Sequence, residues 1–70
     1  MSIQRQIIIE ITREPGASVG KINKLGPFER DDDRRAAYWE LREQGREVYA
    51  IDIHRSGEMY ERPYFRDNER

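Results

Sequence analysis

The stretch that decides the fold is LGPFERDDDRRAAYWELREQG, residues 25–45, which holds three consecutive aspartates and the chain's only tryptophan, Trp39. Acidic residues are favoured in the first turn of a helix, where backbone N–H groups lack partners and the helix dipole is positive. A glycine, as at the end of this stretch, commonly follows the last turn. The pattern predicts a helix over residues 31–44, with Asp31 or Asp32 as the N-cap residue.

The DDDRR cluster has a second interpretation as a metal site. Three consecutive helical residues cannot all point at one ion, and no further ligand follows at a suitable spacing. A helix start explains the same residues, since Asp31 can also pair with Arg34 and Arg35 three and four positions later. We therefore interpret the cluster as structural and expect no metal and no cofactor.

One side of the predicted helix is suited to packing on a sheet. Ala37, Tyr38 and Leu41 fall on one stripe together with the aliphatic stem of Arg34. Trp39 lies well over a quarter-turn away from them. It either wraps over the sheet edge half-buried, or stands exposed as a binding anchor.

Strands are predicted on both sides of this helix. Ile7, Ile9 and Ile11 alternate with other residues, which predicts a strand with one well-buried face. Residues 18–26 fit a second strand, although Val, Ile and Leu at spacing three also fit a short helix. The Gly20 position argues against the helix, because an internal glycine costs about 1 kcal/mol.

The C-terminal third predicts a hairpin. Residues 47–53 form a strand with Tyr49, Ile51 and Ile53 on one face, and residues 58–65 return after a tight turn. Pro63 lies in the return strand and assigns it to a sheet edge.

These elements predict one α+β domain over residues 1–65, followed by a polar, disordered tail at 66–70. The sheet is small and antiparallel, with about four strands in ββαββ order and the helix packed on one face. The alternative is a winged-helix-like fold with a helix at 18–25 and a recognition helix at 31–44. It ranks second because it would set three aspartates next to DNA phosphates.

Composition limits the function classes. The chain has 70 residues, of which 36% are hydrophobic and 39% charged, no cysteine and a net charge of −1. A disulfide framework, a cysteine-based zinc site and a thiol nucleophile are excluded, and the single histidine, His54, has no nucleophile arranged around it. No segment resembles a membrane span or signal peptide. We expect a non-enzymatic protein of the cytoplasm.

The sequence predicts a protein-binding module, of the kind found among the small accessory or inhibitor proteins of phages and plasmids. A homodimer is one form that such a module can take. Aromatic residues and arginine are enriched in protein interfaces. The alternative is nucleic-acid binding, which needs basic residues to neutralise phosphates. The predicted partner-binding residues are Trp39, Glu40, Glu43, Tyr60, Arg62 and Tyr64, and the nucleic-acid alternative uses Arg55 and Arg62.

Residues 24–45 also resemble one strand–turn–helix half of a SPOR domain, the peptidoglycan-binding repeat of cell-division proteins. The matching features are the Gly-Pro-Phe sequence at residues 26–28, Leu41 and Gly45. The resemblance implies a strand before the turn, a helix packed on a sheet, and glycan binding. SPOR domains have two such halves and this chain has one, with Arg34 where the family usually has a small apolar residue.

Overall fold

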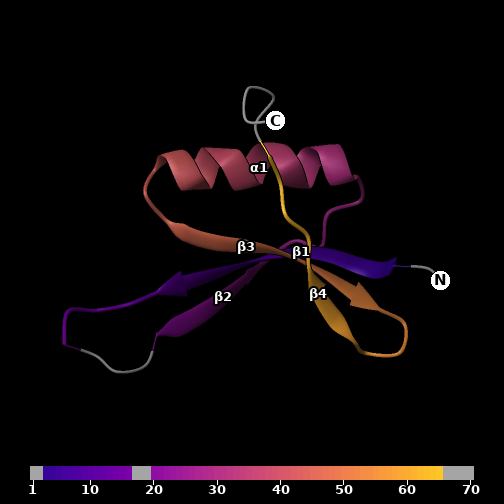
Figure 1. The fold of residues 1–70 in the computed structure, drawn as a ribbon, viewed down its shortest axis with the longest axis horizontal. Coiled ribbons are helices and arrows are strands. Elements are labelled where there is room, and N and C mark those ends of the chain that lie inside the picture. The colour runs from indigo at the N-terminus through magenta and orange to yellow at the C-terminus, as the bar shows by residue number, and fades with distance from the viewer. Residues whose placement is uncertain (1–2, 17–19, 66–70) are drawn as a thin grey trace.

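The chain folds as a four-stranded sheet with one helix lying across it (Figure 1). The computed structural model describes residues 3–16 and 20–65. Its elements, in chain order, are β1 (Ile3–Thr12), β2 (Lys21–Leu25), α1 (Asp31–Glu43), β3 (Glu47–His54) and β4 (Met59–Glu61).

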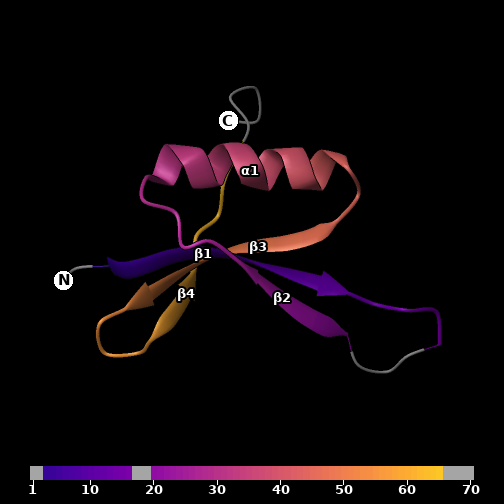
Figure 2. The same cartoon turned by 180° about the vertical axis from the view of Figure 1, so that it is seen from behind.

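The sheet has the strand order β2-β1-β3-β4, and every neighbouring pair is antiparallel. This confirms the predicted α+β fold with ββαββ order. The winged-helix alternative is wrong, because residues 21–25 form a strand where that fold needs a helix; Ser18 and Val19 lie outside the described residues. Seen from both sides, the helix covers one face of the sheet (Figures 1 and 2).

The core lies between α1 and the two central strands. Ile8 of β1 pairs in register with Ala50 of β3, and both are fully buried together with Val48. The small side chains of Val48 and Ala50 allow the helix to come close to the sheet. Tyr38 of the helix completes this layer, and Trp39 packs against it.

The two ends of α1 are built differently. The N-cap residue is Arg30 in an extended conformation, and its side chain makes no capping hydrogen bond. The prediction of Asp31 or Asp32 as the N-cap was therefore wrong, since Asp31 is already helical and its carboxylate is engaged elsewhere. At the other end Gly45 follows the helix with a φ of +83°, as predicted, a left-handed conformation that favours glycine.

The C-terminal segment leaves the sheet sooner than the sequence suggests. β4 has three residues, and its edge position agrees with the effect expected of Pro63, but the predicted strand over 58–65 was too long. Residues 62–65 turn away from the sheet and pass beside α1, which puts the Tyr64 side chain into the core (Figure 1). The predicted disordered tail at 66–70 lies outside the described residues.

Candidate interaction face

The face of the sheet that points away from α1 is largely apolar. Ile8 lies under the helix, so its neighbours along β1 point to the opposite side, because successive strand residues alternate. The strand register places matching residues of the other strands beside them. We call this surface the open face; its apolar residues are Ile7, Ile9, Ile11, Ile22, Tyr49, Ile51, Ile53 and Met59.

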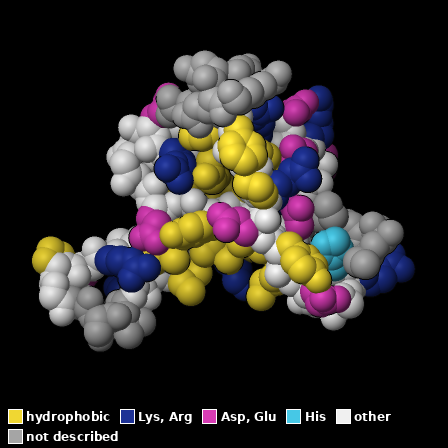
Figure 3. Space-filling view, viewed as in Figure 1, with side chains coloured by type: hydrophobic (Ala, Val, Ile, Leu, Met, Phe, Trp, Pro, Cys, Tyr) yellow, Lys and Arg dark blue, Asp and Glu magenta, His cyan; other side chains and the backbone are white. Residues whose placement is uncertain are grey.

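The open face has no covering layer in the described part of the chain (Figures 1 and 2). Ile22 and Met59, on the two edge strands, are 62% and 63% exposed, whereas Ile7 at the centre is 5% exposed through its neighbours alone. Ile9 and Ile11 are half-buried. The prediction that Ile7, Ile9 and Ile11 mark the well-buried face was therefore wrong in part, since the helix packs on the other side. The space-filling view shows apolar side chains on both sides of the sheet (Figure 3).

Charged residues flank the apolar centre, with opposite signs at opposite edges. On β2, Lys24 lies opposite Ile9 in the register. On β4, Glu61 lies opposite Ile51. Arg5 of β1 adds a positive charge next to Ile53. The open face thus has an apolar centre with a polar rim, the arrangement typical of protein interfaces.

A fourth charged position, Glu47, is held by neighbours on the same side. Arg13 Nε lies 3.1 Å from its Oε1, and the Tyr49 hydroxyl donates to its Oε2 at 2.7 Å. The hydrogen bond from Arg13 lowers the pKa of Glu47, and the same bond raises the pKa of Arg13. The arrangement fixes the Tyr49 ring at one end of the open face.

The helix side of the sheet contains a buried arginine. Arg34 is 0% exposed. Its Nη2 lies 2.7 Å from Asp52 Oδ1 and 3.0 Å from Asp31 Oδ1, and its Nε donates to the Tyr64 hydroxyl at 2.6 Å. Its Nη1 donates to the carbonyl oxygen of Ile51 at 2.9 Å.

These contacts also shift the titration of the cluster. Burial opposes the charged form of Arg34, but its bonds to Tyr64, Asp52 and Asp31 outweigh this and raise its pKa. The pKa of Tyr64 is raised to about 12. Burial is the largest cause, and the 2.6 Å hydrogen bond that the Tyr64 hydroxyl donates to Asp31 is the second. Burial alone would raise the pKa of Asp31, but the hydrogen bonds from Tyr64 and Arg34 outweigh it and lower this pKa. The cluster joins helix, sheet and C-terminal segment, which is a structural role.

Of this cluster, sequence reasoning predicted only the pairing of Asp31 with Arg34, which the structure confirms. It assigned only the stem of Arg34 to the helix–sheet contact and placed Tyr64 on a hairpin surface. A usable signal exists, because Arg34 lies four residues before Tyr38 and so falls on the apolar stripe of the helix. Its partners Asp52 and Tyr64 come from distant segments, which no local pattern connects.

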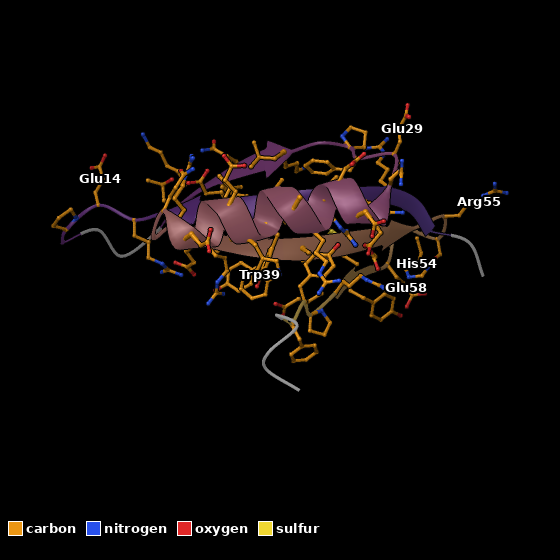
Figure 4. All side chains as sticks on the ribbon, turned by 90° about the horizontal axis from the view of Figure 1, so that it is seen from above. Glu14, Glu29, Trp39, His54, Arg55 and Glu58 are labelled. Carbon is orange, nitrogen blue, oxygen red and sulfur yellow. The ribbon has the colours of Figure 1, made fainter. Side chains whose placement is uncertain are left out.

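The predicted helix surface is only partly exposed. Trp39 is half-buried, and its ring meets that of Tyr38 edge-on at a centroid distance of 5.1 Å. Figure 4 shows it on the flank of the helix. Of the two alternatives, the half-buried one is therefore the one found. Glu40 and Glu43 are exposed.

The predicted hairpin residues do not form one surface. Tyr60 is 51% exposed. Arg62 lies near the helix start, with its Nε 3.4 Å from Asp31 Oδ1. Tyr64 is 9% exposed and belongs to the core rather than to a binding surface. Arg55 extends outward from the β3–β4 turn (Figure 4), whereas Arg62 comes directly after β4.

Within the described ranges 3–16 and 20–65, no group of three His, Asp or Glu side chains is placed to hold a metal ion. In the same residues, no helix is long and apolar enough to cross a membrane. No family model, curated protein or solved structure matches the chain. The resemblance of residues 24–45 to half of a SPOR domain therefore stays a prediction.

Proposed function

We propose that this chain is a non-catalytic protein-binding module and that the open face is its binding surface. The observation that carries the proposal is the continuous apolar surface across all four strands, on the side of the sheet away from α1. Domains bury each apolar face of a sheet against another layer. The described residues supply no such layer on this side of the sheet, and we assign the layer to a protein partner.

The size of the surface supports the proposal. At about 3.3 Å per residue and about 4.8 Å between strands, the four strands cover a flat area of roughly 400 Å². This area includes the charged rim, so its apolar part is smaller; the largest apolar patch on a typical monomer is about 300–600 Å² and is often functional. Covering Ile22 or Met59, which are 62% and 63% exposed, contributes about 1 kcal/mol each, taken as half of the value for full burial. The partly buried isoleucines between them contribute less, which suits a weak, reversible complex.

Nucleic-acid binding is the weaker alternative. The open face has Arg5, Arg13 and Lys24 against Glu47 and Glu61, and Arg13 is already paired with Glu47, so the face offers phosphates little net attraction. Of the two arginines predicted for that role, Arg62 is paired with Asp31. Peptidoglycan binding, which the SPOR resemblance implies, has no further support on the open face.

Site-specific photo-crosslinking in the cell of origin tests the proposal. A photoreactive phenylalanine analogue replaces Met59 on the open face, and in a matched variant it replaces Glu40 on the exposed side of the helix. Both positions are exposed, so the substitutions leave the core intact. We expect protein adducts from the Met59 probe and at most background from the Glu40 probe.

The other outcomes are equally informative. Adducts from Glu40 alone would move the binding surface to the helix and overturn the assignment to the open face. Crosslinks to nucleic acid, or none to any protein at either position, would refute the protein-binding function itself.

A further inference from the structure

We infer that the protein covering the open face is a second copy of this chain, packed face to face with the first. The inference rests on the proposed function and names the partner of the same surface. It follows from three properties of the face, namely its area, its strand order and the distribution of charge along its edges.

The area fits a reversible dimer. A flat area of roughly 400 Å² per copy increases once the relief of the side chains is included, and specific interfaces bury about 800 Å² per partner. The open face is smaller than this and has the size of the interfaces found in weak, transient complexes. We therefore expect a dimer that dissociates at micromolar concentration rather than an obligate one.

The geometry follows from the strand order. Two identical sheets pack face to face when a two-fold axis lies between them, and strands of aligned sheets keep within about 30° of one another. With the axis along the central strands, the Ile7–Ile51 pair lies close to it. The same rotation places β2 of one copy over β4 of the other, because these are the two edge strands.

This arrangement brings opposite charges together. Lys24 is the residue of β2 that lies beside Ile9, and Glu61 is the residue of β4 that lies beside Ile51. Ile51 pairs with Ile7, and Ile9 lies two residues further along β1 on the same face, a shift of about 7 Å along the strands. The long side chains of Lys24 and Glu61 can span this distance. Each Lys24 thus faces a Glu61 of the second copy, and the symmetry forms this pair twice.

The same two residues cannot meet within one chain. β1 and β3 lie between their strands, so their backbones are about 14 Å apart. Any energetic coupling between Lys24 and Glu61 must therefore arise between two copies, which makes the pair a specific reporter of the proposed dimer.

The test uses the purified full chain and two charge-reversal variants, Lys24→Glu and Glu61→Lys. Sedimentation velocity over a dilution series measures the dimer dissociation constant of each. Either variant alone places like charges opposite each other twice, and we expect its dimer to dissociate about tenfold more readily. An equimolar mixture restores both attractive pairs and should form a heterodimer about as stable as the unmodified dimer.

Two further variants define the controls. Ile51→Lys places a charge at the centre of the face and should weaken the dimer at least 100-fold, while Glu40→Lys on the helix should leave it unchanged. Far-UV circular dichroism confirms that each variant is folded. Because Lys24, Glu61 and Glu40 are exposed, their variants keep the test valid even if Ile51→Lys does not fold.

A monomer at all concentrations would overturn the inference, as would a dimer that none of the open-face variants changes. The proposed function is judged separately. If Met59 crosslinks to a different protein while the purified chain is monomeric, the function stands and the second copy does not.

Discussion

The buried arginine provides the sharpest test of how this fold is held together. Arg34 has ion pairs to Asp52 and Asp31, a hydrogen bond to Tyr64 and another to a carbonyl oxygen of the sheet. Replacing it with methionine keeps most of the apolar stem and removes every one of these contacts. Asp52, itself 7% exposed, is then left without its buried partner.

The expected cost follows from this burial. Removing one partner of a buried ion pair typically destabilises a protein by about 3–5 kcal/mol, because an uncompensated charge stays in the interior. A domain of this length has about 4–10 kcal/mol of total stability, from roughly 0.05–0.15 kcal/mol per residue. Arg34→Met should therefore remove about a third or more of the free energy of unfolding.

Urea denaturation followed by Trp39 fluorescence and by far-UV circular dichroism measures this loss. Trp39 is a suitable probe because it is half-buried against the core. The matched control is Arg30→Met, at the helix start, where the side chain is 72% exposed and its contact to Asp32 is 3.9 Å long. We expect the control to change stability by less than about 0.5 kcal/mol.

A second variant separates the lost charge pair from other effects. Arg34→Met combined with Asp52→Leu removes both buried charges, and we expect it to recover at least half of the loss. If Arg34→Met unfolds the chain, the recovery in the double variant still provides the measurement. A cost below about 1 kcal/mol for Arg34→Met, or no recovery in the double variant, would refute the role given to this cluster.

Three further predictions follow from the structure. The pKa of Tyr64 is raised from 10.0 to about 12, so its stabilising contribution is fully present below pH 10 and is lost between pH 10 and 12. The loss is roughly 2 kcal/mol, which urea denaturation at a series of pH values will detect, and Tyr64→Phe should abolish this pH dependence. Gly26→Ala should cost about 2 kcal/mol or more, since φ is +108° and a Cβ would lie 2.9 Å from the Phe28 ring; Gly57→Ala, with φ of +94° and no atom within 4 Å, should cost only about 1 kcal/mol. Met59→Lys should change the stability of the monomer by less than about 1 kcal/mol, because the residue is 63% exposed, and a loss above 2 kcal/mol would contradict an open face.

The helix was predictable because its signals are local. Three aspartates at its start, a glycine beyond its end and an apolar stripe between them define residues 31–44, one residue longer than the helix found. The β3–β4 hairpin follows from equally local signals. The N-cap was missed because Asp31 has a stronger partner in Arg34, which the sequence shows only as a neighbour at spacing three.

The extent of the last strand and the position of Tyr64 were not predictable in the same way. Residues 58–65 read as one strand because they contain aromatic residues, and Pro63 suggested an edge rather than an end. The chain leaves the sheet after Glu61 because Tyr64 has partners on the helix side, where it contacts Arg34 and Asp31. Such contacts between distant segments have no local signature.

The side on which the helix packs shows why counting apolar residues was insufficient. The isoleucine-rich side of the sheet is the more hydrophobic one, but a helix there would set Arg34 over Ile7, Ile9 and Ile51, where the carboxylates of Glu47 and Glu61 lie only at the rim. On the side actually used, Arg34 meets Asp52, and Glu10 at 6% exposure receives both bonds of a bidentate pair from Arg46, at 2.6 and 2.8 Å. An unpaired buried charge costs several kcal/mol, more than the burial of one further isoleucine returns. Charge pairing therefore selects the helix side, and the most apolar surface of the chain is left for a layer that the described residues do not supply.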